Sequence, residues 1–447
     1  MITIKKANEF IVSILRKDSN DILYHCPSLY NIYVKNPNNN LVYSTLTNGL
    51  YILSNQEYNT LINNNIANKE IYLELIEKRL VVPVDCNEYL LTKQLQQVVS
   101  LTQQKNDNYL NTFTILTTTD CNARCFYCYE KGLNRINMNL DTAEGIVQFI
   151  LKNYKEKSVI INWFGGEPLY NLSVIDYITN RLKESNVLYS SNMISNGYLF
   201  SKDIVKKAIS NWCLKKVQIT LDGTEQIYNK YKAYIGKNEI SPFVRVTDNI
   251  EKLILAGITV NIRLNMDNNN ADDLSKLIDW VAKRYPYTDN LHIYPAIILN
   301  KEKPMTSDEC ESLMKSFEKI SQQICSKGLS RFTLERNASI KTATCMANNP
   351  HAVVITPDGK LQRCEHVSDE EVYGDIWSPN INLDIYNSWF TIHEETEKCK
   401  TCTFFPNCRH LKKCKTFIKC TPEEINGKLI RHREAMIKEY QAYIQKN

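Results

Sequence analysis

The sequence lacks any long apolar run: nowhere are 18 consecutive residues apolar, so no membrane-spanning helix is predicted. An export signal is also missing, because the opening MITIKKANEF has no basic start followed by an apolar stretch and a cleavage site. Charge of one sign is not in large excess, since 54 basic and 49 acidic side chains leave a net charge of +5. These absences favour a cytoplasmic protein that contacts neither membranes nor nucleic acid.

Cysteine, by contrast, is plentiful, with 15 cysteines among the 447 residues. Because the cytoplasm keeps thiols reduced, disulfides are not the expected use of these side chains. Clustered cysteines in that compartment usually bind metal. Three of them lie within residues 121–128 and seven within residues 345–420, so these two segments are the candidate metal sites.

The chain is long enough for two or three domains, each with its own core. Residues 1–110 combine short alternating runs with helical stretches and indicate a small α+β module. In residues 111–300, six β-rich apolar runs alternate with helical segments, which predicts a parallel sheet with crossover helices. Six units favour an α/β fold of the partial (β/α)6 barrel type. Residues 301–344 are predicted to form connecting helices, 345–420 a cysteine-rich domain and 421–447 a helical tail.

Helices are expected between the six predicted strands. Their predicted ranges are 141–156, 171–185, 202–211, 242–256 and 271–284. In parallel α/β folds the chemistry lies at the carboxyl ends of the strands. The motifs described below all follow predicted strands.

Directly after the first predicted strand comes a CxxxCxxC loop formed by Cys121, Cys125 and Cys128. Three thiolates so close together can hold one cubic iron–sulfur cluster and leave its fourth iron without a protein ligand. The alternative is a zinc knuckle, which needs a fourth ligand at finger-like spacing. The next cysteine is Cys213 and the next histidine is His292, so zinc is disfavoured.

This loop resembles the signature of the radical S-adenosylmethionine (SAM) superfamily, and Tyr127 stands where that family has an aromatic residue. The resemblance implies that the three cysteines bind a [4Fe–4S] cluster whose open iron chelates the amino and carboxylate groups of SAM. One-electron cleavage of the sulfonium would then release a 5′-deoxyadenosyl radical, which abstracts hydrogen from the substrate.

Four later strand ends resemble further parts of the same family, in the same order. The resemblance assigns to the cofactor site Gly165, Gly166 and Glu167 of the GGEP motif, Ser195 and Asn196 near the ribose, Asp222, and Arg263. Each motif alone is also compatible with an ordinary turn. Their shared order over about 150 residues favours the family interpretation.

The C-terminal cysteines resemble the SPASM extension, which houses two auxiliary four-iron clusters in members that modify peptides and proteins. The resemblance assigns Cys345, Cys364 and Cys414 to auxiliary cluster I, and Cys399, Cys402, Cys408 and Cys420 to auxiliary cluster II. The expected cofactors are therefore SAM and three [4Fe–4S] clusters. A zinc ribbon that uses the first three cysteines of the second group with His410 or Cys414 is the alternative.

Two features depart from the family pattern. Five residues separate Cys408 from Cys414, where three are common, and no cysteine lies between Cys345 and Cys364 to complete cluster I. One iron of that cluster would then be open, or capped by His351, His366 or an anion. An open iron could bind and deprotonate a substrate cysteine thiol.

Two auxiliary clusters offer an electron a route out of the substrate, which favours net oxidation. We therefore expect a maturase that oxidatively cross-links a ribosomally synthesised precursor peptide, by thioether formation. Alternatives are carbon–carbon cross-linking, epimerisation, and sulfatase maturation, in which Glu365 would stand for that family's catalytic Asp. A non-catalytic zinc scaffold is the alternative from another class. The expected partners are a leader-bearing peptide, recognised by residues 1–110, and an electron donor such as flavodoxin or ferredoxin.

Overall fold

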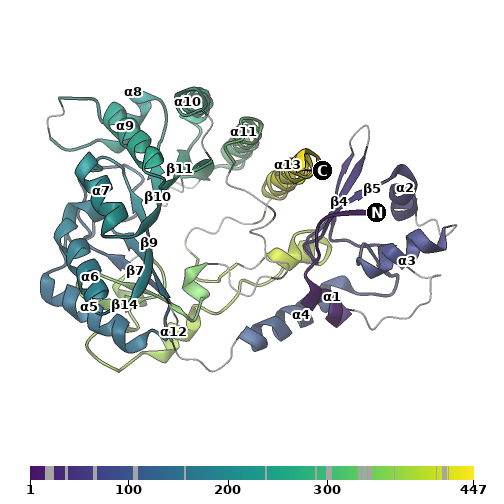
Figure 1. Ribbon diagram of the computed structural model, residues 1–447, viewed down its shortest axis with the longest axis horizontal. Coiled ribbons are helices and arrows are strands. Elements are labelled where there is room, and N and C mark those ends of the chain that lie inside the picture. Colours follow the sequence, from purple (N-terminus) through teal and green to yellow (C-terminus); the bar gives the residue numbers. More distant parts are fainter. Residues whose placement is uncertain are drawn as a thin grey trace.

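The structure is a computed structural model, and Figure 1 shows a barrel-like α/β part on one side, an N-terminal module on the other, and C-terminal segments between them. The residues described are 1–15, 25–35, 39–63, 68–103, 109–155, 158–236, 239–286, 289–298, 305–330, 334, 340, 345–366, 368–408, 410–414, 420 and 422–446. Within these ranges, no helix has both the length and the apolar character needed to cross a membrane.

The main sheet has nine strands, in the order β12-β11-β10-β9-β8-β7-β13-β14-β15. Its parallel barrel strands are β7 (Thr112–Leu116), β8 (Ser158–Phe164), β9 (Leu188–Ser195), β10 (Leu214–Thr220), β11 (Thr259–Met266) and β12 (Leu291–Ile297). Each pairs in parallel with its neighbour in chain order. Among the described strands the order does not return from β12 to β7, so the barrel is open. The predicted α/β fold with six parallel strands is confirmed.

Helices cross over between these strands and cover one face of the sheet (Figure 1). They are α5 (Leu140–Asn153), η2 (Pro168–Asn171), α6 (Leu172–Glu184), α7 (Lys202–Ser210), α8 (Glu225–Lys232), α9 (Pro242–Leu255) and α10 (Ala271–Arg284). Local chemistry sets their starts: the Asn139 side chain caps α5, and Pro242 occupies the first turn of α9. All five predicted helices are present, whereas the short helix α8 was not predicted.

The core of this part lies between the sheet and the helices. It is built on fully buried aromatic side chains, among them Phe113, Trp163 and Trp212, together with aliphatic residues of α5, α6, α9 and α10. Burial of a large apolar side chain contributes about 2 kcal/mol or more to folding. The rigid sheet that results fixes the positions of the loops that follow each strand.

The cysteine-rich segment joins the same sheet. Strand β13 (Ala352–Ile355) pairs in parallel with β7, and β14 (Lys360–Gln362) and β15 (Gly374–Asp375) continue the sheet antiparallel. The other C-terminal elements are α11 (Ser307–Ser326), η4 (Met346–Asn348), η5 (Asp369–Glu371), α12 (Leu383–Ser388), η6 (Glu397–Thr401), η7 (Phe405–Asn407) and α13 (Pro422–Lys446). Of the predicted connecting helices, α11 is described, and most of residues 331–344 lie outside the described residues.

The N-terminal module has a four-stranded antiparallel sheet in the order β1-β5-β4-β3. Its elements are β1 (Ile2–Lys5), α1 (Glu9–Leu15), β2 (His25–Pro27), β3 (Asn31–Lys35), β4 (Asn40–Ser44), β5 (Leu50–Leu53), α2 (Asn55–Asn63), α3 (Lys69–Glu77), β6 (Val81–Pro83) and α4 (Glu88–Gln103). The sheet packs against the C-terminal helix α13, where Ile32 and Tyr43 share a core with Met436. The two ends of the chain thus form one packed unit (Figure 1).

Candidate active site

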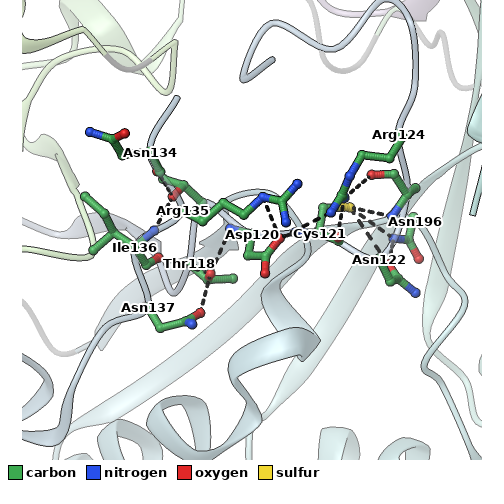
Figure 2. A network of polar contacts seen from close by, with 12 residues as sticks. Thr118, Asp120, Cys121, Asn122, Arg124, Asn134, Arg135, Ile136, Asn137 and Asn196 are labelled. Atoms are coloured by element: carbon green, nitrogen blue, oxygen red, sulfur yellow. Dashed lines mark hydrogen bonds and ion pairs between the residues drawn. The ribbon is translucent and has the colours of Figure 1, made fainter. Parts of the chain in front are cut away.

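The CxxxCxxC loop follows β7, as predicted, and a network of polar contacts holds its backbone (Figure 2). Asp120 accepts a hydrogen bond from the Cys121 amide at 2.8 Å and forms an ion pair with Arg135 at 3.4 Å. The Arg124 guanidinium donates to the carbonyls of Cys121 and Ala123, at 2.5 and 2.7 Å. These contacts fix the loop independently of any ligand.

Burial and nearby acidic groups raise the pKa of two thiols of the loop, Cys121 and Cys128. Burial raises the pKa of Cys121 to about 12, with smaller contributions from Glu167 and Cys125. Burial also raises the pKa of Cys128, with contributions from Glu130 and Cys125. Cluster binding would therefore displace protons from these thiols. As they stand, no three His, Cys, Asp or Glu side chains in the described ranges converge to metal-binding distance. The donor set itself, three thiols on one loop, fits a cluster with one open iron.

The two glycines of the GGEP motif are needed because the cluster loop lies directly against them. A Cβ atom at Gly165 would lie 2.1 Å from the Thr118 carbonyl oxygen, and one at Gly166 would lie 2.3 Å from the Asp120 carbonyl oxygen. The Gly166 amide donates to the Thr118 carbonyl at 3.0 Å. The motif therefore seats the start of the cluster loop on the end of β8.

Glu167 is fully buried, and both of its carboxylate oxygens accept hydrogen bonds from this chain. Oε1 accepts from the Ser195 hydroxyl at 2.8 Å and the Leu169 amide at 3.2 Å, and Oε2 accepts from the Asn196 amide at 2.7 Å. Burial raises the pKa of Glu167 to about 7, although these donors oppose the shift. The side chain thus joins the ends of β8 and β9, and its assignment to the cofactor site stays a prediction.

Of the remaining predicted cofactor residues, Asn196 and Asp222 follow the ends of β9 and β10, whereas Arg263 lies within β11. The Asn196 side chain donates to the Asn122 side chain at 2.7 Å, within the cluster loop. Arg263 on β11 donates to Asn265 at 2.9 Å. The Tyr127 hydroxyl donates to Asp222 at 2.7 Å. The sheet therefore brings Tyr127, the GGEP motif, Asn196 and Asp222 to one edge.

One residue at this edge was missed by sequence reasoning. Lys232, at the end of α8, lies 3.3 Å from Asp222 and donates to the Tyr127 hydroxyl at 3.0 Å. A surface-like helix sequence, EQIYNKYK, gave no signal for a buried lysine. The sequence likewise did not predict the left-handed backbone conformation of Ala233.

The cysteines predicted for auxiliary cluster I lie near one another. Burial raises the pKa of Cys364 to about 12, with contributions from Glu365, Cys345 and Cys414. The pKa of Cys345 is raised by burial, then by Glu365 and Cys414. Glu365 is thus a close neighbour of these thiols.

A buried arginine, also missed by sequence reasoning, supports this group. The Arg363 guanidinium donates to the carbonyls of Ala347, Ala352 and Asn349 at 2.9, 2.7 and 2.6 Å. It is 1% exposed and lies over the Tyr386 ring. Arg363 therefore fixes the turn that follows Cys345.

The two histidines proposed as caps have different surroundings. His351 stacks on Tyr109 and shares a 3.0 Å hydrogen bond through Nδ1 with the Tyr109 carbonyl. The His366 ring lies 4.1 Å from the Tyr129 ring, centroid to centroid. Burial, followed by Glu130 and Glu365, raises the pKa of Tyr129. His366 and Tyr129 thus lie between the cluster loop and the cysteines assigned to auxiliary cluster I.

The cysteines predicted for auxiliary cluster II also lie near one another. Burial raises the pKa of Cys408 to about 11, with Lys428 opposing the shift and Cys402, Cys420 and Cys399 adding to it. Cys399 and Cys402 also pack against the N-terminal module, in a cluster with buried Tyr30 and Leu95.

Comparisons with known proteins identify the central domain. Residues 115–281 match the family described as the Radical SAM superfamily. A cysteine-type anaerobic sulfatase-maturating enzyme of Clostridium novyi (strain NT) is 24% identical over 330 residues, which cover 65% of this chain and 84% of that protein. A GTP 3′,8-cyclase of Clostridium perfringens (strain SM101 / Type A) is 24% identical over 281 residues, or 60% of this chain and 81% of that protein.

Two solved structures share the fold at lower identity. Native anSMEcpe with bound AdoMet and Kp18Cys peptide superposes with a TM-score of 0.53 at 17% identity, over 75% of this chain and 98% of that chain. Streptococcus suis SuiB bound to precursor peptide SuiA gives a TM-score of 0.50 at 14% identity, over 86% and 94% of the two chains. Residues 115–281 thus form a radical SAM domain, of the superfamily that binds SAM and a [4Fe–4S] cluster.

Proposed function

We propose that this enzyme oxidatively cross-links a ribosomally synthesised peptide by joining a cysteine sulfur to a carbon atom. The observation that carries the proposal is the grouping of seven C-terminal cysteines into two sets. One set, Cys345, Cys364 and Cys414, has only three members and lies beside Glu365. The other, Cys399, Cys402, Cys408 and Cys420, would supply four thiolate ligands.

Electron balance links these sets to oxidation. Forming a thioether from a thiol and a C–H bond removes two hydrogens from the peptide. When bound, the cluster and SAM of the radical SAM domain supply the group that takes one hydrogen atom. The second hydrogen leaves as a proton and an electron, and oxidised auxiliary clusters can accept that electron. An enzyme that only isomerises its substrate has no need of such an acceptor.

The incomplete set would give the substrate thiol a place to bind. Three thiolates would leave one iron of auxiliary cluster I for an external ligand, and a thiol bound there would lose its proton readily. Glu365 adjoins Cys364, which supports a role for it as the acceptor of that proton. Tyr129 and His366 lie between this set and the cluster loop, where a peptide must sit for reaction.

The N-terminal module supports a peptide substrate. Its sheet ends in edge strands β1 and β3, and an extended peptide can add to such an edge. SuiB, which shares the fold over most of its length, has been solved with its precursor peptide SuiA. We infer that residues 1–110 recognise a leader segment, and that flavodoxin or ferredoxin supplies the electron that cleaves SAM.

Co-expression with a cysteine-bearing precursor peptide tests this function. Mass spectrometry should show the loss of two hydrogens per cross-link, and the anaerobically purified enzyme should hold about twelve irons. A Cys364→Ala variant should still cleave SAM but leave the peptide unmodified. Uptake of solvent deuterium without loss of mass would indicate epimerisation and would contradict the proposal.

Sulfatase maturation is the second candidate, and the likeness to the Clostridium novyi enzyme favours it. In this case Glu365 acts as the base that removes a proton as a substrate cysteine is oxidised to formylglycine. Incubation with a cysteine-type sulfatase peptide separates the two candidates. Formylglycine is an aldehyde and reacts with hydrazide probes, whereas a thioether does not react with them.

A further inference from the structure

A buried charged triangle connects the cluster loop to α8. Lys232 is 4% exposed and Asp222 is fully buried. The Lys232 ammonium lies 3.3 Å from the Asp222 carboxylate and donates to the Tyr127 hydroxyl at 3.0 Å. Tyr127 donates in turn to Asp222 at 2.7 Å. The three side chains come from three separate segments of the barrel, so the triangle fixes these segments relative to one another.

The main chain at the end of α8 also holds the cluster loop. The Lys232 carbonyl accepts a hydrogen bond from the Arg124 amide at 2.9 Å, and the Cys125 thiol lies 3.9 Å from the same oxygen. Three residues later, the Ile235 amide donates to the Asn122 carbonyl at 2.9 Å. The residues between the cysteines are therefore bonded to α8 and its following turn.

The buried pair of Lys232 and Asp222 is better explained by a positioning role than by a contribution to stability. A buried ion pair contributes little net stability compared with apolar side chains of the same size, whereas removing one partner is costly. Among the described residues, the second oxygen of Asp222, Oδ1, is buried without a hydrogen-bond donor. Buried polar atoms are nearly always satisfied, so this oxygen requires a donor from a ligand or a water molecule.

We propose that Lys232 is a positioning residue of the radical SAM site. Its carbonyl holds the loop that carries Cys121, Cys125 and Cys128, and its ammonium holds Tyr127 and one oxygen of Asp222. The other oxygen is left to accept a hydrogen bond from SAM. The inference rests on the assignment of the cluster to this loop and not on the peptide chemistry proposed above.

A charge series separates positioning from simple packing. The variants are K232M, K232R, D222N and the double variant D222N/K232M. The control is K230M, which makes the same change at an exposed lysine of α8. The midpoint potential is measured from the EPR signal that changes when SAM is added, which singles out the radical SAM cluster. Hydrogen exchange of segment 121–125 is measured on the cluster-free protein.

We expect K232M to lower the midpoint potential, because it removes a positive charge that stabilises the reduced cluster. It should also speed amide exchange in segment 121–125 by roughly tenfold, because it breaks a buried pair. D222N should raise the potential, and the double variant should return it toward wild type. K232R and K230M should match wild type in both measurements.

An unchanged potential and SAM-dependent EPR signal in K232M, with only a lower melting temperature, would show that Lys232 is ordinary packing. If K232M does not fold, D222N provides the test instead. An unchanged midpoint potential in D222N would overturn the proposal. A wild-type enzyme with iron but no SAM-dependent signal would overturn the cluster assignment, and this inference with it. Failure of peptide modification alone, with the charge series as expected, would count against the proposed function only.

Discussion

The Ser195 hydroxyl donates a 2.8 Å hydrogen bond to the buried Glu167 carboxylate, which joins the ends of β9 and β8. A Ser195→Ala variant should lose about 1–3 kcal/mol of stability, because it leaves a buried carboxylate short of a donor. SAM affinity should fall with it. Chemical denaturation and calorimetric SAM titration measure both effects. Ser190→Ala, in the same strand, is the control. Equal losses in the two variants would contradict the role given to Ser195.

A Gly166→Ala variant should displace the cluster loop, because the new Cβ would meet the Asp120 carbonyl oxygen at 2.3 Å. We expect iron binding at this loop to be lost and SAM cleavage with it. Gly132→Ala is the control, because nothing lies within 4 Å of the Gly132 Cβ position, whereas its φ of +90° adds only backbone strain. Iron analysis and a 5′-deoxyadenosine assay compare the two. Retained iron in G166A would mean that the loop can shift without cost.

Replacement of Arg363 by Met should unfold the turn around Cys345. Three buried carbonyls lose their donor, which we expect to cost about 3 kcal/mol or more. Under the proposed function, iron content should fall from about twelve to about eight per chain, because auxiliary cluster I would be lost. Thermal denaturation and iron analysis test this, with SAM cleavage preserved. A full iron complement in R363M would contradict the prediction.

The ion pair between α5 and α6 should make stability depend on pH. Hydrogen bonds from Arg181, and then from Gln148 and Tyr177, lower the pKa of Glu144 from 4.5 to about 2, although burial opposes this shift. The pair therefore stabilises the fold above about pH 4.5, and this contribution is lost as the pH falls toward 2. Both side chains are about one-third exposed, so the contribution is below about 1 kcal/mol.

Urea denaturation of wild type and Glu144→Gln at pH 7 and pH 3 measures this effect. The difference in free energy of unfolding between the two proteins should be larger at pH 7 than at pH 3. Glu184→Gln is the control, because Glu184 pairs with the same arginine but is far more exposed. If this difference in free energy of unfolding grew as the pH fell, the prediction would be wrong.

Local patterns in the sequence predicted the six parallel strands, five of the barrel helices and the position of the cluster loop. Helix α8 was missed because its buried face consists of Tyr228, Tyr231 and Lys232, so no apolar stripe marks it. The parallel pairing of β13 with β7 joins residues more than 230 positions apart, and no local pattern reports such a contact. Arg363 was missed for a similar reason, since its three carbonyl partners are set by tertiary packing.

The packing of Cys399 and Cys402 against Tyr30 and Leu95 constrains how this enzyme could be re-engineered. A chimera that replaces only the first 110 residues with those of a relative would remove Tyr30 and Leu95, which pack against Cys399 and Cys402. Under the proposed function, leader recognition and electron transfer would therefore have to be exchanged together. To preserve these contacts, a graft has to transfer the N-terminal module, the 399–408 segment and helix α13 together.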